Sequence, residues 1–172
     1  MLALSIALPL TSRLHAQSQS ASQREYEIKA AYLYNFINYV AWPADALPGS
    51  TITLGIVGEN PFGAALNPLN GKKVKGRTLA VRQVSDARSM GQCQIVFFSS
   101  SEKPRLSEWL DKLKDSRALT VSEVEGFAQR GGIINFISEH NKVRFEINPA
   151  SARERGLTIS SELLKLANVV KS

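Results

Sequence analysis

The sequence predicts a single layered α/β domain whose mixed, mostly parallel sheet is flanked by helices and closed by a C-terminal β-hairpin and a final helix. Short apolar runs rich in β-branched residues alternate along the chain with segments that carry helical signals. This alternation is typical of parallel strands joined by helices that cover the sheet. With 172 residues, of which 44% are hydrophobic and 21% charged, the chain has the size and composition of one globular domain.

The first 24 residues are expected to lie outside this domain. An apolar run over residues 2–10 is followed by Ala16 and a polar tail of Gln and Ser, the order found in a secretory signal and its cleavage site. We therefore predict a signal peptide over residues 1–16 and a disordered linker over residues 17–24. No Lys or Arg precedes the apolar run, so we expect this signal peptide to be truncated at its N-terminus. The alternative is a disordered cytosolic tail.

The domain, over residues 25–172, is expected to open with a helix that runs to Pro43. All four tyrosines of the chain lie in this segment, and no Gly or Pro interrupts it. Apolar residues at spacing four, with two neighbours, predict one broad buried face, made of Ile28, Tyr32, Leu33, Phe36, Ile37 and Val40. The opposite face of this helix is expected to carry Lys29.

Aromatic rings are also expected outside that buried face, and we interpret Tyr34, Tyr39 and Trp42 as candidate partner-binding or dimer-binding residues. Tyr, Trp and Phe are common anchors of protein interfaces. The alternative is a core helix whose tyrosines are half buried, with their hydroxyls in water.

Strands and helices then alternate. Asn60-Pro61 is a helix-start signal, because Asn caps free N–H groups and Pro suits the first helical turn. It predicts a short helix ending at Leu66 or Leu69. Apolar residues at spacings of three, one and three predict an amphipathic helix over residues 103–113. Runs rich in Val, Ile, Leu and Phe predict strands, at residues 51–58, 77–84, 94–98 and 118–121.

The C-terminal part is expected to make the sheet mixed. Two apolar runs, 132–137 and 143–147, are joined by a polar turn and predict an antiparallel hairpin. Asn148-Pro149 repeats the helix-start signal. A final helix is expected over residues 160–170, opened by serines and carrying one apolar face.

Residues that carry catalysis or bind metals are sparse. His15 lies in the predicted signal peptide and His140 in the hairpin turn, so neither is placed to complete a catalytic triad or a zinc site. The single cysteine, Cys93, opens an apolar strand and is expected to be a small buried residue. Glu123 and Glu125 are interpreted as a solvated turn rather than a catalytic pair. We therefore predict no catalytic residue, no metal and no cofactor.

Four polar residues form a candidate ligand pocket: Asn60, Arg144, Glu146 and Arg153. Ligands bind at strand ends in open α/β sheets, and the first strand runs into Asn60. Arg144 and Glu146 share one strand face, where buried charges need partners. The structural alternative is that Glu146 pairs with Arg144 or Arg153, and that Asn60 only caps a turn.

The chain is basic, with 21 Lys and Arg against 15 Asp and Glu and a net charge of +6. Its densest basic stretch, residues 72–77, has no interleaved aromatic residues and is interpreted as a solvated turn, so we expect no nucleic-acid partner. No stretch reaches the roughly 18 apolar residues that a membrane-spanning helix requires.

Three stretches together resemble the YfiR family: residues 29–43, 132–136 and 143–167. The resemblance extends over about residues 25–170. It implies a small periplasmic α/β domain that binds the periplasmic sensor domain of an inner-membrane diguanylate cyclase and represses the cyclase. The output would be control of cyclic di-GMP and biofilm formation.

The resemblance also implies further partners, namely an outer-membrane lipoprotein with a peptidoglycan-binding domain and a second copy of the chain. Family repressors use pairs of cysteines in disulfides, whereas Cys93 is alone, which excludes an intrachain disulfide. Our leading interpretation is a non-enzymatic periplasmic regulator. The alternatives are a periplasmic small-molecule-binding sensor and an α/β enzyme that uses carboxylates.

Overall fold

The computed structural model describes residues 10–170, with side chains described from residue 19 onward. Within these residues, an eight-stranded sheet has the order β10-β8-β7-β6-β5-β2-β4-β3. A separate antiparallel pair joins β1 (Val40–Ala41) to β9 (Thr158–Ile159). The predicted mixed, mostly parallel sheet is confirmed. Its strands are β2 (Thr51–Val57), β3 (Lys73–Val74), β4 (Arg77–Val84), β5 (Ile95–Phe98), β6 (Leu119–Ser122), β7 (Ile134–Glu139), β8 (Lys142–Ile147) and β10 (Asn168–Val169).

The order of the parallel strands brings separate segments together at one edge of the sheet. The parallel strands lie side by side in the order β4, β2, β5, β6 and β7, and each adjacent pair is parallel. The chain passes from β2 to β4 on one side and then returns to β5 on the other side of β2. This is the flavodoxin-like order, in which ligands bind beyond the carboxyl ends of the two central strands. Here those strands are β2 and β5.

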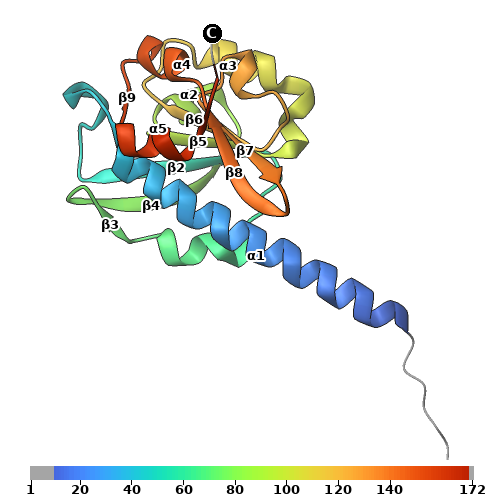
Figure 1. Ribbon diagram of the computed structural model, residues 1–172. Coiled ribbons are helices and arrows are strands. Elements are labelled where there is room, and N and C mark those ends of the chain that lie inside the picture. The colour runs from blue at the N-terminus through green and yellow to red at the C-terminus, as the bar shows by residue number, and fades with distance from the viewer. Residues whose placement is uncertain (1–9, 171–172) are drawn as a thin grey trace, which may run out of the picture.

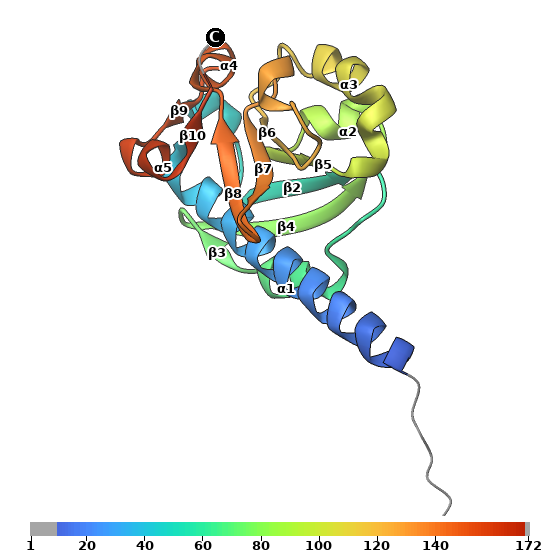
Figure 2. The same ribbon diagram turned by 45° about the vertical axis from the view of Figure 1, so that its right-hand side comes forward.

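Helices cover both faces of the sheet, so the domain has three layers (Figures 1 and 2). Alternation along β5 sends Ile95 and Phe97 to one buried cluster, and Val96 and Phe98 to the other. The first face is covered by α1 (Leu10–Tyr39), the 3-10 helix η2 (Gly63–Leu69) and α5 (Ser161–Leu166), and the second by α2 (Ala87–Gly91) and α3 (Leu106–Lys112). Other helical turns are η1 (Ala44–Ala46), η3 (Ser100–Arg105), η4 (Ala128–Arg130) and α4 (Pro149–Glu154).

The buried face of α1 is shifted by about one residue from the predicted face. Phe36 and Ile37 are fully buried, as predicted. Ile28, however, is 47% exposed, whereas Lys29 is only 6% exposed. The prediction for these two residues was wrong because Glu123, which follows β6, supplies an ion-pair partner for Lys29 at this point of the helix.

α1 begins and ends earlier than predicted. It begins at Leu10 and includes residues 17–24, which were predicted to be a disordered linker. No Gly or Pro lies between residue 10 and Pro43, so the sequence carries no signal that stops the helix there. The first half of α1 projects beyond the sheet (Figure 1), and the side chains of residues 19–24 are exposed. Cleavage after Ala16 stays a prediction, and residues 1–9 of the predicted signal peptide lie outside the described part of the chain.

Three other boundaries differ from the prediction. The final helix ends at Leu166, and β10 then pairs with β8 in place of a last helical turn. The helix predicted from Asn60 starts at Gly63, because Asn60 Oδ1 accepts the Phe62 N–H and closes a local turn. The stretch over residues 72–77, interpreted as a solvated turn, contains the edge strand β3.

The C-terminal hairpin is confirmed. β7 and β8 pair antiparallel along their whole length. The two loop residues, His140 and Asn141, have φ angles of 50° and 59°, the left-handed conformation that a tight hairpin turn requires. No helix in the part of the chain that the structure describes is long and apolar enough to cross a membrane.

Candidate functional site

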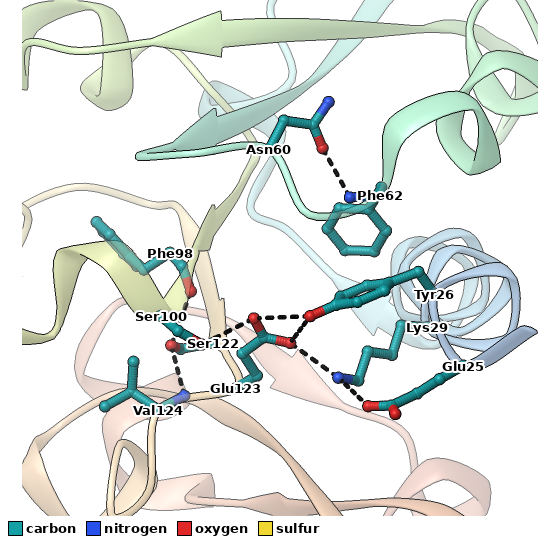
Figure 3. Close-up of polar contacts among 10 residues, drawn as sticks. All are labelled: Glu25, Tyr26, Lys29, Asn60, Phe62, Phe98, Ser100, Ser122, Glu123 and Val124. Carbon is teal, nitrogen blue, oxygen red and sulfur yellow. Dashed lines mark hydrogen bonds and ion pairs between the residues drawn. The ribbon is translucent and has the colours of Figure 1, made fainter. Parts of the chain in front are cut away.

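Four side chains from three separate segments meet at the carboxyl ends of β5 and β6 (Figure 3). Glu123 directly follows β6, and Ser100 follows β5. Tyr26 and Lys29 come from α1. We refer to Tyr26, Lys29, Ser100 and Glu123 as the Glu123 cluster, and Glu25 lies beside it.

The Glu123 carboxylate is the centre of the cluster. It accepts hydrogen bonds from Lys29 Nζ at 2.8 Å, from Ser100 Oγ at 2.9 Å and from the Tyr26 hydroxyl at 3.2 Å. The side chains of Lys29 and Glu123 are only 7% and 9% exposed. Glu25 Oε1 lies 2.5 Å from the same Lys29 Nζ, so two carboxylates flank one ammonium group.

Burial and mutual contact change the proton affinities of this group. Burial by itself would lower the pKa of Lys29, but its hydrogen bonds to Glu123 and Glu25 outweigh burial and raise that pKa. Burial is the largest cause that raises the pKa of Tyr26, and the negative charge of Glu123 adds to it. Lys29 is therefore held charged and Tyr26 neutral, so both donate to the Glu123 carboxylate.

The loop after β6 is held in place by its own serine. Ser122 Oγ donates to the Phe98 carbonyl oxygen at 2.8 Å and accepts the Val124 N–H at 3.1 Å. These bonds join the ends of β5 and β6 and orient the next carboxylate toward α1 (Figure 3). The Phe62 ring packs edge-on against Tyr26 with 5.3 Å between ring centroids. The cluster is thus preorganised by both packing and hydrogen bonds.

Two serine hydroxyls, of Ser99 and Ser101, lie beyond the carboxyl ends of β2 and β5. Ser101 Oγ accepts the Glu59 N–H at 2.9 Å and lies 2.8 Å from Ser99 Oγ. Gly58, directly after β2, has a φ of 84°, and a Cβ built there would lie 2.3 Å from Ser101 Oγ. Glycine suits both the backbone conformation and this close approach. Two serine hydroxyls therefore lie beside the strand ends where this strand order typically places a ligand.

A cavity of about 260 Å³ opens beside the Glu123 cluster, and Glu25, Phe136, Ile137 and Ser138 complete its lining. This volume is below the roughly 300 Å³ at which pockets for drug-sized ligands begin. The cavity therefore suits a small polar molecule or one side chain of a partner. Within residues 10–170, no group of three or more His, Cys, Asp or Glu side chains is arranged to hold a metal ion.

Among the described residues, no hydrogen bond or ion pair joins the members of the predicted ligand pocket. They lie on separate elements: Asn60 in the loop after β2, Arg144 and Glu146 on β8, and Arg153 on α4. The prediction that Glu146 pairs with an arginine was wrong. Its carboxylate instead accepts hydrogen bonds from Asn135 Nδ2 at 3.2 Å and from Gln129 Nε2 at 3.3 Å. Both arginines are exposed. Asn60 closes a turn, as the structural alternative expected.

The three aromatic candidates differ in exposure. Tyr39 is 43% exposed. Tyr34 is half buried, and its hydroxyl donates to the Lys73 carbonyl oxygen at 3.1 Å. Trp42 is 9% exposed, and its indole N–H donates to the Arg117 carbonyl oxygen at 3.1 Å. Trp42 is therefore a core residue and lacks the exposure on which its selection as a partner-binding residue depended.

Sequence reasoning missed the Glu123 cluster. The interpretation of Glu123 as part of a solvated turn was wrong, since its side chain is buried against α1. Lys29 was assigned to the outer face of the helix. Because Lys29 and Glu123 are 94 positions apart, no local pattern signals their contact.

A comparison with protein families matches residues 26–168 to the YfiR/HmsC-like family. The chain belongs to this family. The matched region contains every member of the Glu123 cluster and ends within β10. The YfiR resemblance stated from three sequence stretches is confirmed. YfiR/HmsC-like membership suggests a periplasmic regulator of cyclic di-GMP signalling.

Two solved structures share the fold of this YfiR/HmsC-like chain. A conserved domain protein from Vibrio cholerae has a TM-score of 0.58 and 10% identity, with 85% of this chain and 60% of that chain covered. An ABC domain from Streptococcus pneumonia, in complex with L-Trp, has a TM-score of 0.51 and 12% identity, with 70% and 55% covered. This chain thus spans 60% or less of their length, and the likeness shows the α/β fold alone. A search of curated protein sequences gave no significant match.

Proposed function

We propose that this protein is a non-enzymatic periplasmic regulator that binds the periplasmic sensor domain of an inner-membrane diguanylate cyclase and represses the cyclase. Export through the predicted signal peptide is part of this proposal. An outer-membrane peptidoglycan-binding lipoprotein and a second copy of the chain are further proposed partners. The proposed output is a lower level of cyclic di-GMP and less biofilm.

The observation that carries the proposal is the family match over residues 26–168, which includes the C-terminal part of α1 and nearly all of the sheet. The Glu123 cluster agrees with a binding role. Three donors already satisfy the Glu123 carboxylate. Tyr26 and Lys29, whose pKa values are both raised, are two of these donors. Such a network holds a helix in place, whereas a general base needs access to the proton it removes.

Binding and repression are tested separately. The purified chain is titrated against the periplasmic domain of the diguanylate cyclase from the same organism by biolayer interferometry, and cyclic di-GMP is measured in cells with and without the protein. We expect saturable binding and a rise in cyclic di-GMP when the protein is removed. No binding together with an unchanged cyclic di-GMP level would contradict the proposal.

The cavity beside the Glu123 cluster favours a second candidate function, a small-molecule-binding sensor. The cavity is polar, and Lys29 lies between two carboxylates at its wall. One protein of similar fold was solved in complex with L-Trp. Calorimetric titration with free amino acids, L-Trp included, tests this function. We expect heat of binding for the wild type and none for Glu123→Gln, and no heat for the wild type would exclude amino acids as ligands.

A further inference from the structure

A second and larger hollow lies between α1 and the tip of the β7–β8 hairpin. Its volume is about 840 Å³. One wall is α1 from Ala21 to Tyr32, and the other is the hairpin from Ser138 to Arg144. We call it the hairpin groove. It adjoins the cavity of the Glu123 cluster, since Glu25 and Ser138 line both.

The rim of the hairpin groove carries unpaired positive charge. Arg24, Lys142 and Arg144 line it, and none of them makes an ion pair or a side-chain hydrogen bond within the described residues. Glu25 is the only acidic residue in the lining, and its carboxylate is already bound to Lys29. The groove therefore presents three cations that form no ion pair within residues 10–170.

The floor of the groove is apolar. Ile28 is 47% exposed, whereas Leu33, Phe36 and Ile37 on the same helix are fully buried. Tyr32 and Val143 beside it are half buried. The Tyr32 ring packs against Phe145 of β8, at 5.2 Å between ring centroids, so this part of the floor is joined to the core of the domain. An exposed apolar floor with a charged rim is the composition of a protein interaction site.

We propose that the hairpin groove binds an acidic amphipathic segment of the partner protein. Apolar side chains of that segment contact Ile28, Tyr32 and Val143, and its carboxylates pair with the three basic residues of the rim. This proposal rests on the proposed regulator function and names the surface and the partner chemistry behind it. A concave groove between a helix and a hairpin favours a peptide segment over a membrane, because a flat bilayer surface reaches only the rim.

Charge reversal tests the proposal. The triple variant Arg24→Glu, Lys142→Glu, Arg144→Glu is compared with a matched triple variant at exposed residues elsewhere, Lys103→Glu, Lys114→Glu, Lys165→Glu. Both change the net charge equally. The probe is the purified sensor domain of the diguanylate cyclase. We expect the groove variant to weaken binding by about 100-fold or more, the matched variant by less than about threefold, and the wild-type affinity to fall with salt.

Folding of each variant is checked by thermal unfolding. Because the three rim side chains make no ion pair or side-chain hydrogen bond in the described part of the chain, an unchanged Tm is expected. Equal binding by the two triple variants would overturn the groove proposal and leave the regulator function standing. A wild type that does not bind the sensor domain would overturn both.

Vesicles of phosphatidylglycerol are a second probe. Loss of vesicle binding in the groove variant, with binding of the sensor domain unchanged, would assign the groove to a membrane surface and overturn the proposal.

Discussion

Lys29 and Glu123 form an ion pair between two buried side chains that are far apart in sequence. Removing both charges from water is costly, and the hydrogen bonds from Tyr26 and Ser100 offset part of that cost. The pair therefore need not raise the net stability of the domain. It specifies where α1 crosses the end of β6, because any other position would leave a buried charge unpaired.

Removing one member of this pair is expected to destabilise the domain. Lys29→Met leaves the Glu123 carboxylate buried without its cation, so the free energy of unfolding should fall by about 3 kcal/mol. The double variant Lys29→Met, Glu123→Leu should lose less than the two single variants added together. Urea denaturation measures each value. Glu108→Gln, at an exposed ion pair on α3, is the control and should leave the unfolding midpoint unchanged.

The shifted pKa values predict a loss of stability at alkaline pH. Lys29 and Tyr26 keep their protons in the folded chain above 10.5 and 10.0, the values at which free Lys and Tyr titrate. The folded state then binds more protons than the unfolded state, so the contribution of these two groups to the free energy of unfolding falls as pH rises through this range and is constant below it. Burial of Cys93, which raises the pKa of its thiol from 9.0 to about 11, adds a fall of the same sign. Urea midpoints from about pH 8 to 11 measure the fall. Lys29→Met should show a shallower fall, and an equal slope would exclude Lys29 as its cause.

Cys93 is expected to be unreactive in the native protein. Its side chain is 4% exposed, and burial raises the pKa of its thiol to about 11. Only the thiolate reacts with iodoacetamide. Alkylation at pH 8 should therefore be slow in the native state and fast in urea, as measured by mass spectrometry. Rapid native labelling would show that the segment between α2 and β5, where Cys93 lies, opens easily.

At the scale of elements, the single helix α1 carries both core residues and surface residues. Phe36 is fully buried and packs against Phe136 and Phe145, with ring centroids 5.6 and 5.1 Å apart. Phe36→Ala should lower the free energy of unfolding by about 3–5 kcal/mol. Tyr39 is 43% exposed, so Tyr39→Ala should change it far less. Urea denaturation compares the two variants, and similar losses would mean that Tyr39 is also part of the core.

Elements with a strong local pattern were predictable from the sequence. The strand over residues 77–84 matches β4, and the hairpin is found where two apolar runs flank a polar turn. Short strands that depend on distant partners were not predictable. β1 and β10 have two residues each, and they exist because β9 and β8 lie beside them. The Glu123 cluster was missed for the same reason, since its members come from three segments.

At the scale of the whole molecule, the projecting start of α1 is separable from the domain. The side chains of residues 19–24 are exposed, so this part of the helix buries little apolar surface. A chain that starts at Gln17 should therefore unfold within a few degrees of the full chain in a thermal scan. A large drop in Tm would show that the preceding residues stabilise the domain, which would contradict the predicted cleavage after Ala16.

The end of α1 is held by a segment near the C-terminus. Val40 and Ala41 pair with Ile159 and Thr158, and the Ser160 N–H donates to the Tyr39 carbonyl oxygen at 2.9 Å. During synthesis, the ribosome makes the opening helix more than a hundred residues before it makes this partner. The nascent chain therefore cannot lock its first helix into place until translation is nearly complete. Such a delay keeps the polypeptide unfolded for longer, which is the form that a secretion channel threads across a membrane.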